Sequence, residues 1–96
     1  MIVSFGDKAS EDIFNGISSK NSRKLPNTIL SVACRKLDMI NAAESLEDLK
    51  APPQNRLKLL KGDLQGYHSI RINDQFRIIF RMVESNAFNV RIIDCH

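Results

Sequence analysis

The 96-residue sequence is poor in the residues that form covalent or metal-bound cross-links. Its two cysteines, Cys34 and Cys95, are far apart in the chain, and its two histidines, His68 and His96, stand alone. Neither a disulfide framework nor a zinc-ligand spacing is therefore present, and we expect no metal or other cofactor. We interpret both cysteines as free thiols, with a Cys34–Cys95 disulfide as the alternative.

Long apolar runs are also missing. No stretch approaches the roughly 18 apolar residues of a membrane-spanning helix. The opening, MIVSFGDKASED, lacks the basic segment and apolar core of a signal peptide. Hydrophobic residues make up 43% and charged residues 26%, as in ordinary globular proteins. We expect a cytoplasmic protein without membrane association, and its length fits a single domain over residues 1–96.

Acidic residues are scarce in the second half of the chain. Residues 1–50 carry seven Lys or Arg and seven Asp or Glu, whereas residues 51–96 carry seven Lys or Arg and four Asp or Glu. The net charge of +3 therefore arises in the second half. Such an excess favours polyanions, because each phosphate that a cation contacts releases condensed counterions. A charged surface that only serves solubility is the alternative.

Two helices are predicted in the first half, after a short strand at residues 2–5. Asp7 and the acidic residues that follow it are typical of a helix start, and this helix fades at Gly16. The polar segment 18–24 (SSKNSRK) predicts a mobile loop, either a solvated connector or a basic flap over a substrate. Apolar residues then recur at three- and four-residue spacing over residues 26–43, which predicts a second helix with one buried stripe.

The second half predicts an antiparallel sheet. Segments 57–61, 67–73, 76–83 and 88–94 are separated by short turns, which make neighbouring strands antiparallel. Strands that follow two helices predict an α+β fold: a short N-terminal strand and two helices packed on one face of a three- to four-stranded sheet. The other face is then expected to stay open.

Period-two alternation separates the two faces of the predicted strands. One face of segment 76–83 is apolar and should pack on the helices: Phe76, Ile78, Phe80 and Met82. The opposite face carries Arg77 and Arg81. In the last strand the same alternation places Arg91 on one face together with Asn89 and Ile93. The open face is therefore expected to carry arginines.

Basic and proton-transferring side chains near strand ends are the candidates for chemistry. Cleavage of RNA by its own 2′-hydroxyl needs a base, cations around the phosphate and an acid for the leaving oxygen. Arg and Lys can hold the phosphate charge, and His can transfer protons near neutral pH. Each residue alone has a plain structural alternative, such as a solvated surface cation or a frayed end. The candidates are Arg56, Lys58, Lys61, Arg77, Asp94 and His96.

The segment NRLKLLKGDLQGYHSIRINDQFRIIFR and the final IIDCH resemble the HigB branch of the RelE/ParE toxin superfamily. The opening MIVSFGDKASEDIFNG and the segment RKLDMINAAESLEDLKAPP are similar to the plasmid-maintenance killer proteins of that family. The resemblance implies a RelE-like fold and a toxin of a type II toxin–antitoxin pair that cuts mRNA on the ribosome without a metal. It also implies a helix-turn-helix (HigA-type) antitoxin partner, with operator DNA bound only through the complex.

The resemblance also implies a role for each matching residue. Lys61, in the LKGD motif, would neutralise phosphate charge, and Arg77 would face the RNA. Asp94 and His96 match the C-terminal motif, where Asp94 shapes the site and His96 is the catalytic candidate. Further contacts to RNA or the ribosome are expected from Arg56, Lys58, Arg81, Arg91 and Cys95.

Two positions depart from the family pattern. Lys58 stands where the family often has a His, and Cys95 stands where it typically has a Tyr that can stack on a base. We therefore expect weak cleavage. A toxin that acts on another target, such as DNA gyrase, remains an alternative, although Lys61 and the Asp94/His96 pair argue against it. A catalytically weak co-repressor that only binds its antitoxin is the other alternative.

Overall fold

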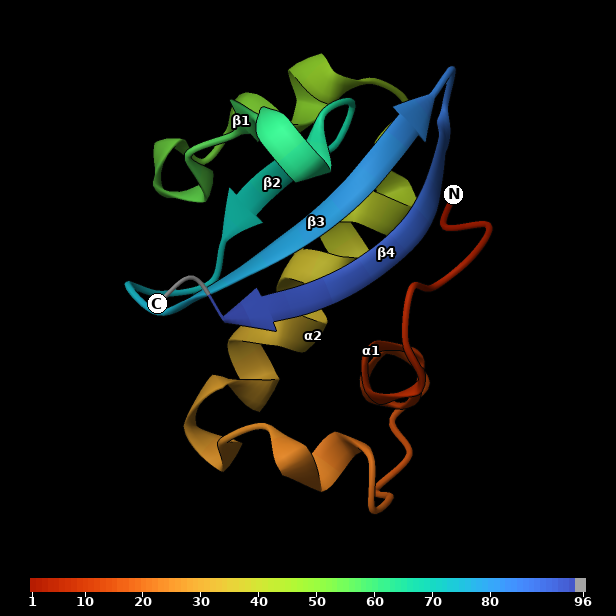
Figure 1. Cartoon of the computed structure of the whole chain (residues 1–96), viewed down its shortest axis with the longest axis vertical. Helices are drawn as coiled ribbons and strands as arrows, with labels where there is room; N and C mark the ends of the chain where they lie inside the picture. Colours follow the sequence, from red (N-terminus) through yellow and green to blue (C-terminus); the bar gives the residue numbers. More distant parts are fainter. Residues whose placement is uncertain (95–96) are drawn as a thin grey trace.

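A computed structural model describes residues 1–94, which form a four-stranded antiparallel sheet with two α-helices (Figure 1). The strands lie across the sheet in the order in which they occur in the chain. They are β1 (Lys58–Leu59), β2 (His68–Arg71), β3 (Phe76–Val83) and β4 (Asn86–Asp94). This is the predicted meander, because each short turn joins neighbouring strands.

The two helices, α1 (Lys8–Phe14) and α2 (Asn27–Ala42), match the two predicted helical segments. Asp7 caps α1, because its carboxylate accepts the Ser10 N–H at 2.9 Å. Figure 1 shows α2 behind the sheet, with α1 beside it near the outer edge of β4. The predicted α+β arrangement of two helices on an antiparallel sheet is therefore confirmed. No helix within residues 1–94 is long and apolar enough to cross a membrane.

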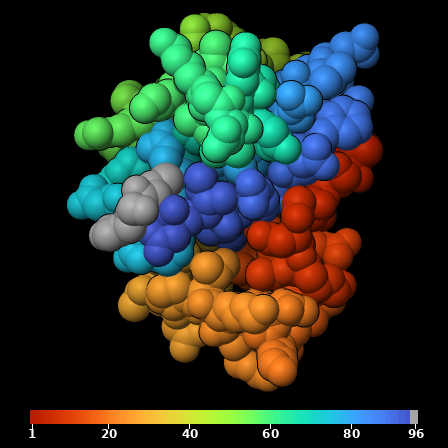
Figure 2. Space-filling view, in the orientation of Figure 1, coloured from red at the N-terminus to blue at the C-terminus, as the bar shows by residue number. Residues whose placement is uncertain are grey.

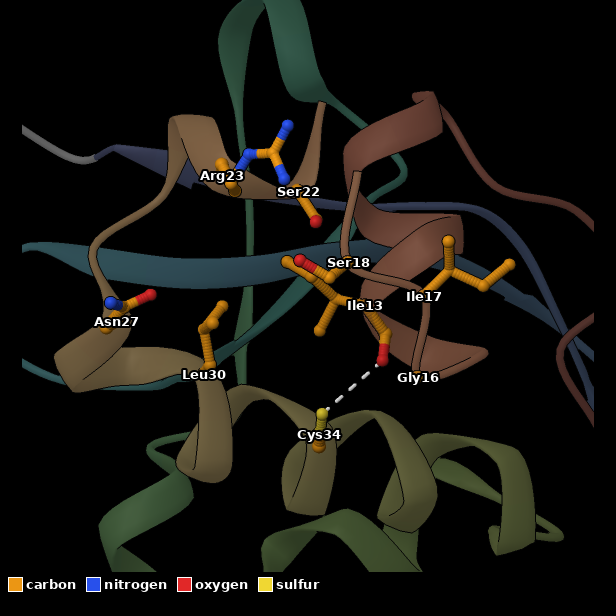
Figure 3. A pocket seen from close by; sticks show the side chains of 9 residues that line it. All are labelled: Ile13, Gly16, Ile17, Ser18, Ser22, Arg23, Asn27, Leu30 and Cys34. Carbon is orange, nitrogen blue, oxygen red and sulfur yellow. Dashed lines mark hydrogen bonds between the residues drawn. The ribbon is translucent and has the colours of Figure 1, made fainter. Parts of the chain in front are cut away.

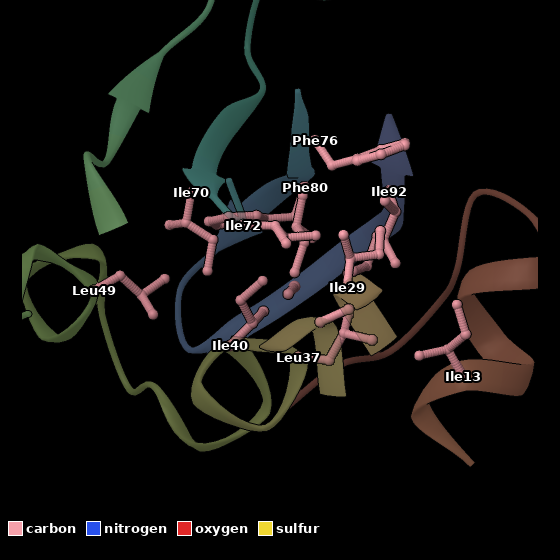
Figure 4. Packing of buried hydrophobic residues seen from close by; sticks show 14 of the residues in the cluster. Ile13, Ile29, Leu37, Ile40, Leu49, Ile70, Ile72, Phe76, Phe80 and Ile92 are labelled. Carbon is pink, nitrogen blue, oxygen red and sulfur yellow. The ribbon is translucent and has the colours of Figure 1, made fainter. Parts of the chain in front are cut away.

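The core lies between α2 and one face of the sheet (Figure 4). The buried stripe of α2 includes Leu37 and Ile40, and the alternating residues Ile78 and Phe80 of β3 meet it from the sheet. All four side chains are fully buried. Burial of one such side chain stabilises the fold by about 1.5–3 kcal/mol. The two sequence periodicities thus account for the packing of the helix on the sheet.

A β-bulge in β4 was not predicted. Ile79 pairs with Arg91 but Arg81 pairs with Phe88, so two residues of β4 face one residue of β3. Asn89 lies in the bulge with φ 56°, a left-handed conformation that Asn adopts more readily than most residues. The alternation that predicts one face for Asn89, Arg91 and Ile93 is therefore interrupted at Asn89.

The predicted N-terminal strand (residues 2–5) makes only two isolated bridges, both parallel to β4. The bulge explains why the pairing is broken. The Asn89 N–H donates to the Ser4 hydroxyl at 2.9 Å. In a continuous strand pairing this N–H would donate to a backbone carbonyl of the neighbouring strand. The segment therefore lies along the outer edge of β4 without forming a regular strand.

Segment 18–24 is anchored in the helix layer. It contains the 3-10 turn η1 (Ser22–Lys24), in which Ser22 is buried. The Ser19 hydroxyl donates to Asp12 of α1 at 2.6 Å, and the Ser19 N–H donates to the Ser22 hydroxyl at 2.8 Å. The predicted loop therefore contains a 3-10 turn, and its serines hold it to α1 by polar contacts. The segment packs against α1 and not over the arginine-bearing face.

Ser10→Ala should destabilise the protein. Ser10 is fully buried, and its hydroxyl accepts the Ile92 N–H at 2.9 Å, which ties α1 to β4. Loss of that acceptor leaves a buried N–H unpaired, at a cost of about 1–3 kcal/mol. We expect a lower denaturant midpoint of unfolding for Ser10→Ala and an unchanged midpoint for Ser31→Ala, whose site on α2 is exposed. Equal midpoints for both variants would contradict this assignment.

Candidate functional site

The face of the sheet away from α2 carries basic residues in two neighbouring rows. Directly paired residues of antiparallel strands point to the same side, so the strand register defines each row. Because strands lie about 4.8 Å apart, a row across all four strands spans about 14 Å. One row is Lys58, Ser69, Ile79 and Arg91, and the next is Arg71, Arg77 and Ile93. The prediction that this face carries Arg77 and Arg91 is therefore confirmed.

Arg77 is held in one orientation on this face. Its Nε donates to the hydroxyl of Ser69 at 2.8 Å, and its Nη2 donates to the backbone carbonyl of Arg56 at 2.8 Å. Ser69 is itself fully buried. Two hydrogen bonds from different nitrogens fix the plane of the guanidinium, which is a good match for phosphate oxygens. A cation that is already oriented does not have to reorganise when negative charge develops beside it.

Arg81 lies further along the same side of β3. Its guanidinium carbon is 5.1 Å from the ring centroid of Tyr67, a cation–π contact, and its Nη2 donates to the carbonyl of Gln65 at 3.4 Å. Gly66 has φ +91°, and a Cβ there would lie 2.7 Å from Nη2 of Arg81. Glycine therefore permits both the backbone conformation and the close approach of the guanidinium.

The face opposite α2 is not open along its whole length. Residues 56–66, including the 3-10 turn η4 (Gly62–Leu64), lie in front of β2 and β3 in Figure 1 and form much of the green surface in Figure 2. Ile79 points to this side and is nevertheless fully buried. The prediction of an open face is therefore wrong over this part. Alternation assigns a side to each residue, but it does not show that a segment rich in turns folds back over that side.

Three further predicted cations surround this face, and all three are exposed. Lys58 lies opposite Ser69, and Arg56 precedes β1 by two residues. Lys61 follows Leu60, whose N–H donates to the Tyr67 carbonyl at 2.9 Å, beyond the end of β1. The structure therefore brings Arg56 and Lys58 towards Arg77, whereas Lys61 lies towards the end of the sheet that carries Arg81.

Arg71 completes the row of Arg77 and is absent from the residues predicted from sequence. It pairs directly with Arg77 across β2 and β3, and its guanidinium forms an ion pair with Asp74 at 2.5 Å. The hydrogen bond from Arg71 lowers the pKa of Asp74 below its usual range. Alternation in segment 67–73 puts Arg71 on the same side as Ser69, which is a usable signal. Its position beside Arg77 depends on the register and cannot be taken from alternation alone.

Asp94 lies at the end of β4, opposite Phe76, and is exposed. This pairing directs it towards the helix side of the sheet, whereas Arg77 belongs to the next pair and the opposite side. Its Oδ2 accepts a hydrogen bond from Nε2 of Gln75 at 3.0 Å. Cys95 and His96, the other residues of the predicted C-terminal motif, lie outside the described residues.

His68 does not belong to the arginine-bearing face. It pairs with Phe80 on the helix side of the sheet, and the two rings stack with centroids 6.4 Å apart. Burial lowers the pKa of His68, so its imidazole is neutral at pH 7. Residues 1–94 contain no group of three or more His, Cys, Asp or Glu that could hold a metal ion. The described part of this face therefore offers phosphate binding by cations.

A separate pocket of about 400 Å³ lies on the helix side, between α1 and α2 (Figure 3). Its lining includes the apolar side chains of Ile13, Ile17 and Leu30. Cys34 also lines it as a free thiol that donates to the Ile13 carbonyl at 3.4 Å. Burial, with the nearby charge of Asp38, raises the pKa of this thiol and keeps it protonated. The pocket contains none of the residues predicted to carry chemistry.

Comparison with known sequences agrees with this architecture. Residues 3–96 match the family described as the RelE-like toxin of type II toxin–antitoxin system HigB. The chain is 39% identical over 89 residues to Toxin HigB-1 of Vibrio cholerae serotype O1, covering 93% of this chain and 92% of that protein. It is 42% identical over 73 residues to an uncharacterized protein of Haemophilus influenzae, covering 76% and 71% of the two chains.

Solved structures show the same fold. The YoeB–YefM toxin–antitoxin complex from Staphylococcus aureus contains a chain with a TM-score of 0.60 at 14% identity, covering 100% of this chain and 98% of that one. The RelBE2 toxin–antitoxin complex from Mycobacterium tuberculosis gives a TM-score of 0.51 at 21% identity, covering 98% and 88%. These likenesses confirm the RelE-like fold alone, whereas the match over residues 3–96 shows the family. The chain belongs to the HigB family of RelE-like toxins of type II toxin–antitoxin systems.

Proposed function

We propose that this toxin is an endoribonuclease that cuts mRNA on the ribosome, without a metal, and so inhibits translation. The observation that carries the proposal is the orientation of Arg77, whose guanidinium is held by Ser69 and by the Arg56 carbonyl among further cations. Attack by a 2′-hydroxyl concentrates negative charge on the scissile phosphate. A donor that is oriented towards such charge typically accelerates a reaction by about 10²–10³-fold.

In the proposed reaction the 2′-oxygen attacks the adjacent phosphorus, and the bond from phosphorus to the 5′-oxygen of the next nucleotide breaks. Arg77 holds the non-bridging phosphate oxygens. His96 transfers protons and Asp94 helps to shape its surroundings, two roles that rest on the resemblance to the family. Lys61 neutralises phosphate charge, a role that also rests on the resemblance. Cys95 and the other cations contact RNA or the ribosome, and Arg71 joins them because it lies beside Arg77. These cations are Arg56, Lys58, Arg71, Arg81 and Arg91.

The proposed dependence on the ribosome follows from what the described residues supply. They provide positive charge, but their one histidine, His68, faces the helix side and is neutral at pH 7. A ribosome that fixes the mRNA would supply orientation, which contributes up to about 7–11 kcal/mol in well-aligned reactions. We therefore place the activity in the cytoplasm, on translating ribosomes.

Cleavage should depend on translation. We expect negligible cutting of purified mRNA and at least about 100-fold faster cutting of the same mRNA in a translating extract, because the ribosome orients the reacting groups. The matched control is the same transcript without its start codon, which should stay intact in the extract. Equal rates for translated and untranslated transcripts would contradict the proposal.

We further propose that the partner is a HigA-type antitoxin with a helix-turn-helix domain. Membership of a type II toxin–antitoxin family supports an antitoxin partner, as do the related folds solved in toxin–antitoxin complexes. Operator DNA would be bound only through the antitoxin. Copurification of the toxin with the product of an adjacent gene, and a gel shift that needs both proteins, would test this assignment.

A catalytically weak co-repressor is the second candidate. The observation that favours it is that Arg77 and Arg81 both donate to backbone carbonyls of segment 56–66, as arginines with a structural role would. Pulse-labelling after induction separates the candidates. Early loss of amino-acid incorporation supports the mRNA endoribonuclease, early loss of DNA synthesis points to a target such as gyrase, and no early loss points to the co-repressor.

A further inference from the structure

Lys36 is buried in α2 although its side chain carries a charge. It is 6% exposed, and lysines are almost never buried to this extent without a partner. No carboxylate within residues 1–94 forms an ion pair with it, and its Nζ donates to the side-chain carbonyl of Asn55. Burial lowers the pKa of Lys36, and the nearby charges of Arg35 and Arg71 lower it further. Because burial is unfavourable for a charged group, the hydrogen bond to Asn55 is important for holding Lys36 in this position.

Asn55 joins α2 to the segment that leads into β1. It is fully buried, and its Oδ1 accepts the hydrogen bond from Lys36. Its Nδ2 donates to the carbonyls of Leu49 at 3.2 Å and Ala51 at 3.4 Å. Contacts with the helix and with the preceding turn therefore fix the position of Asn55, which ends the 3-10 turn η3 (Pro53–Asn55).

The next residue, Arg56, has a left-handed backbone with φ 46° and ψ 54°. Residues other than glycine adopt this conformation only where their surroundings hold them in it. The anchored Asn55 holds Arg56 on one side. On the other side, the Arg56 carbonyl accepts the hydrogen bond from Nη2 of Arg77 at 2.8 Å. A continuous series of contacts thus runs from α2 to the guanidinium on the opposite face of the sheet.

We infer that Lys36 and Asn55 are positioning residues, which set the orientation of Arg77 through the backbone carbonyl of Arg56. Their contacts lie with α2 and with the turn before β1, so they act through Arg77 and not on RNA. The inference rests on the proposed function, because it takes Arg77 as the group that holds the scissile phosphate. It adds that part of the site is built from buried residues in the helix layer.

Lys36→Met tests this role, because methionine keeps most of the apolar stem and removes the donor to Asn55. We expect the maximal cleavage rate in a translating extract to fall about 10- to 100-fold, as for a misplaced catalytic group. The ribosome concentration at half-maximal rate should stay nearly constant, since the exposed cations are untouched. Arg35→Met, which removes an exposed cation one position away on the same helix, should change neither quantity.

A double-mutant cycle separates positioning from a general loss of stability. In an Arg77→Lys background, Lys36→Met should cause no further fall in the maximal rate, because the group that Lys36 orients is already absent. A further fall as large as in wild type would overturn the inference. If Lys36→Met does not fold, as judged by circular dichroism, Lys36→Leu takes its place, since leucine is also apolar and has no donor for Asn55.

Nuclear magnetic resonance gives a readout that does not depend on cleavage. The Nε–H of Arg77, bonded to Ser69, should exchange slowly in wild type and faster in Lys36→Met, with no change in Arg35→Met. An unchanged Arg77 signal in Lys36→Met would overturn the inference whatever the activity. A changed signal in a protein that never cuts mRNA would leave the positioning role intact and contradict the proposed function alone.

Discussion

Arg77→Ala should abolish growth inhibition and lower the rate of mRNA cleavage by about 10²–10³-fold, the effect expected when one oriented donor is removed from developing charge. The reason is geometric, because Arg77 is held by Ser69 and by the Arg56 carbonyl before any RNA binds. Cleavage is measured in a translating extract at saturating ribosome concentration. Arg77→Lys should also lose most activity, because an ammonium cannot reproduce both hydrogen bonds of the guanidinium.

Arg81→Ala is the matched control for this prediction. Arg81 lies on the same side of β3 and also donates to a backbone carbonyl, that of Gln65, but it stands apart from the row of Arg71 and Arg77. We expect a smaller loss of cleavage for Arg81→Ala than for Arg77→Ala. Full toxicity of Arg77→Ala would refute the site. Unfolding of Arg77→Ala, judged by its melting temperature, would instead assign Arg77 a structural role.

His96→Ala should lower the cleavage rate by about 10²–10⁴-fold, the usual contribution of a general acid or base. The expectation comes from the C-terminal motif shared with the family, since His96 lies outside the described residues. His68, on the helix side of the sheet, provides the matched control. We expect His68→Gln to keep nearly all activity in the same assay. If His96→Ala cut mRNA as fast as wild type, the motif assignment would fail and Lys58 or Lys61 would become the candidate for the chemistry.

The elements of the fold were predictable because apolar periodicity is a local property of the chain. The stripe through Leu37 and Ile40 predicts the buried side of α2, and the alternation of Ile78 and Phe80 predicts the side of β3 that meets it. The bulge at Asn89 was not predictable in this way. Its residue Asn89 donates a hydrogen bond to Ser4, a residue far away in the chain, and local alternation carries no sign of such a contact.

The candidate site was likewise predictable in its local features but not in its contacts between distant segments. Alternation places Arg77 on the face opposite the helices, and the register confirms it. The orientation of its guanidinium depends on Ser69 and on the carbonyl of Arg56, which belong to other segments. The periodicity of α2 does not show that Lys36 is buried against Asn55. Contacts between segments that are distant in the chain thus decide the features of the site that the sequence pattern leaves open.

Mapping of mRNA 5′ ends after induction of wild type, Arg77→Ala and His96→Ala tests the proposed endoribonuclease activity most directly. For wild type we expect new 5′ ends inside coding regions, at a fixed phase of the reading frame, because the ribosome advances one codon at a time. Both variants should produce almost none of these ends. New ends that occur equally often in untranslated regions, or the same ends in Arg77→Ala as in wild type, would contradict cleavage on the ribosome by the Arg77 site.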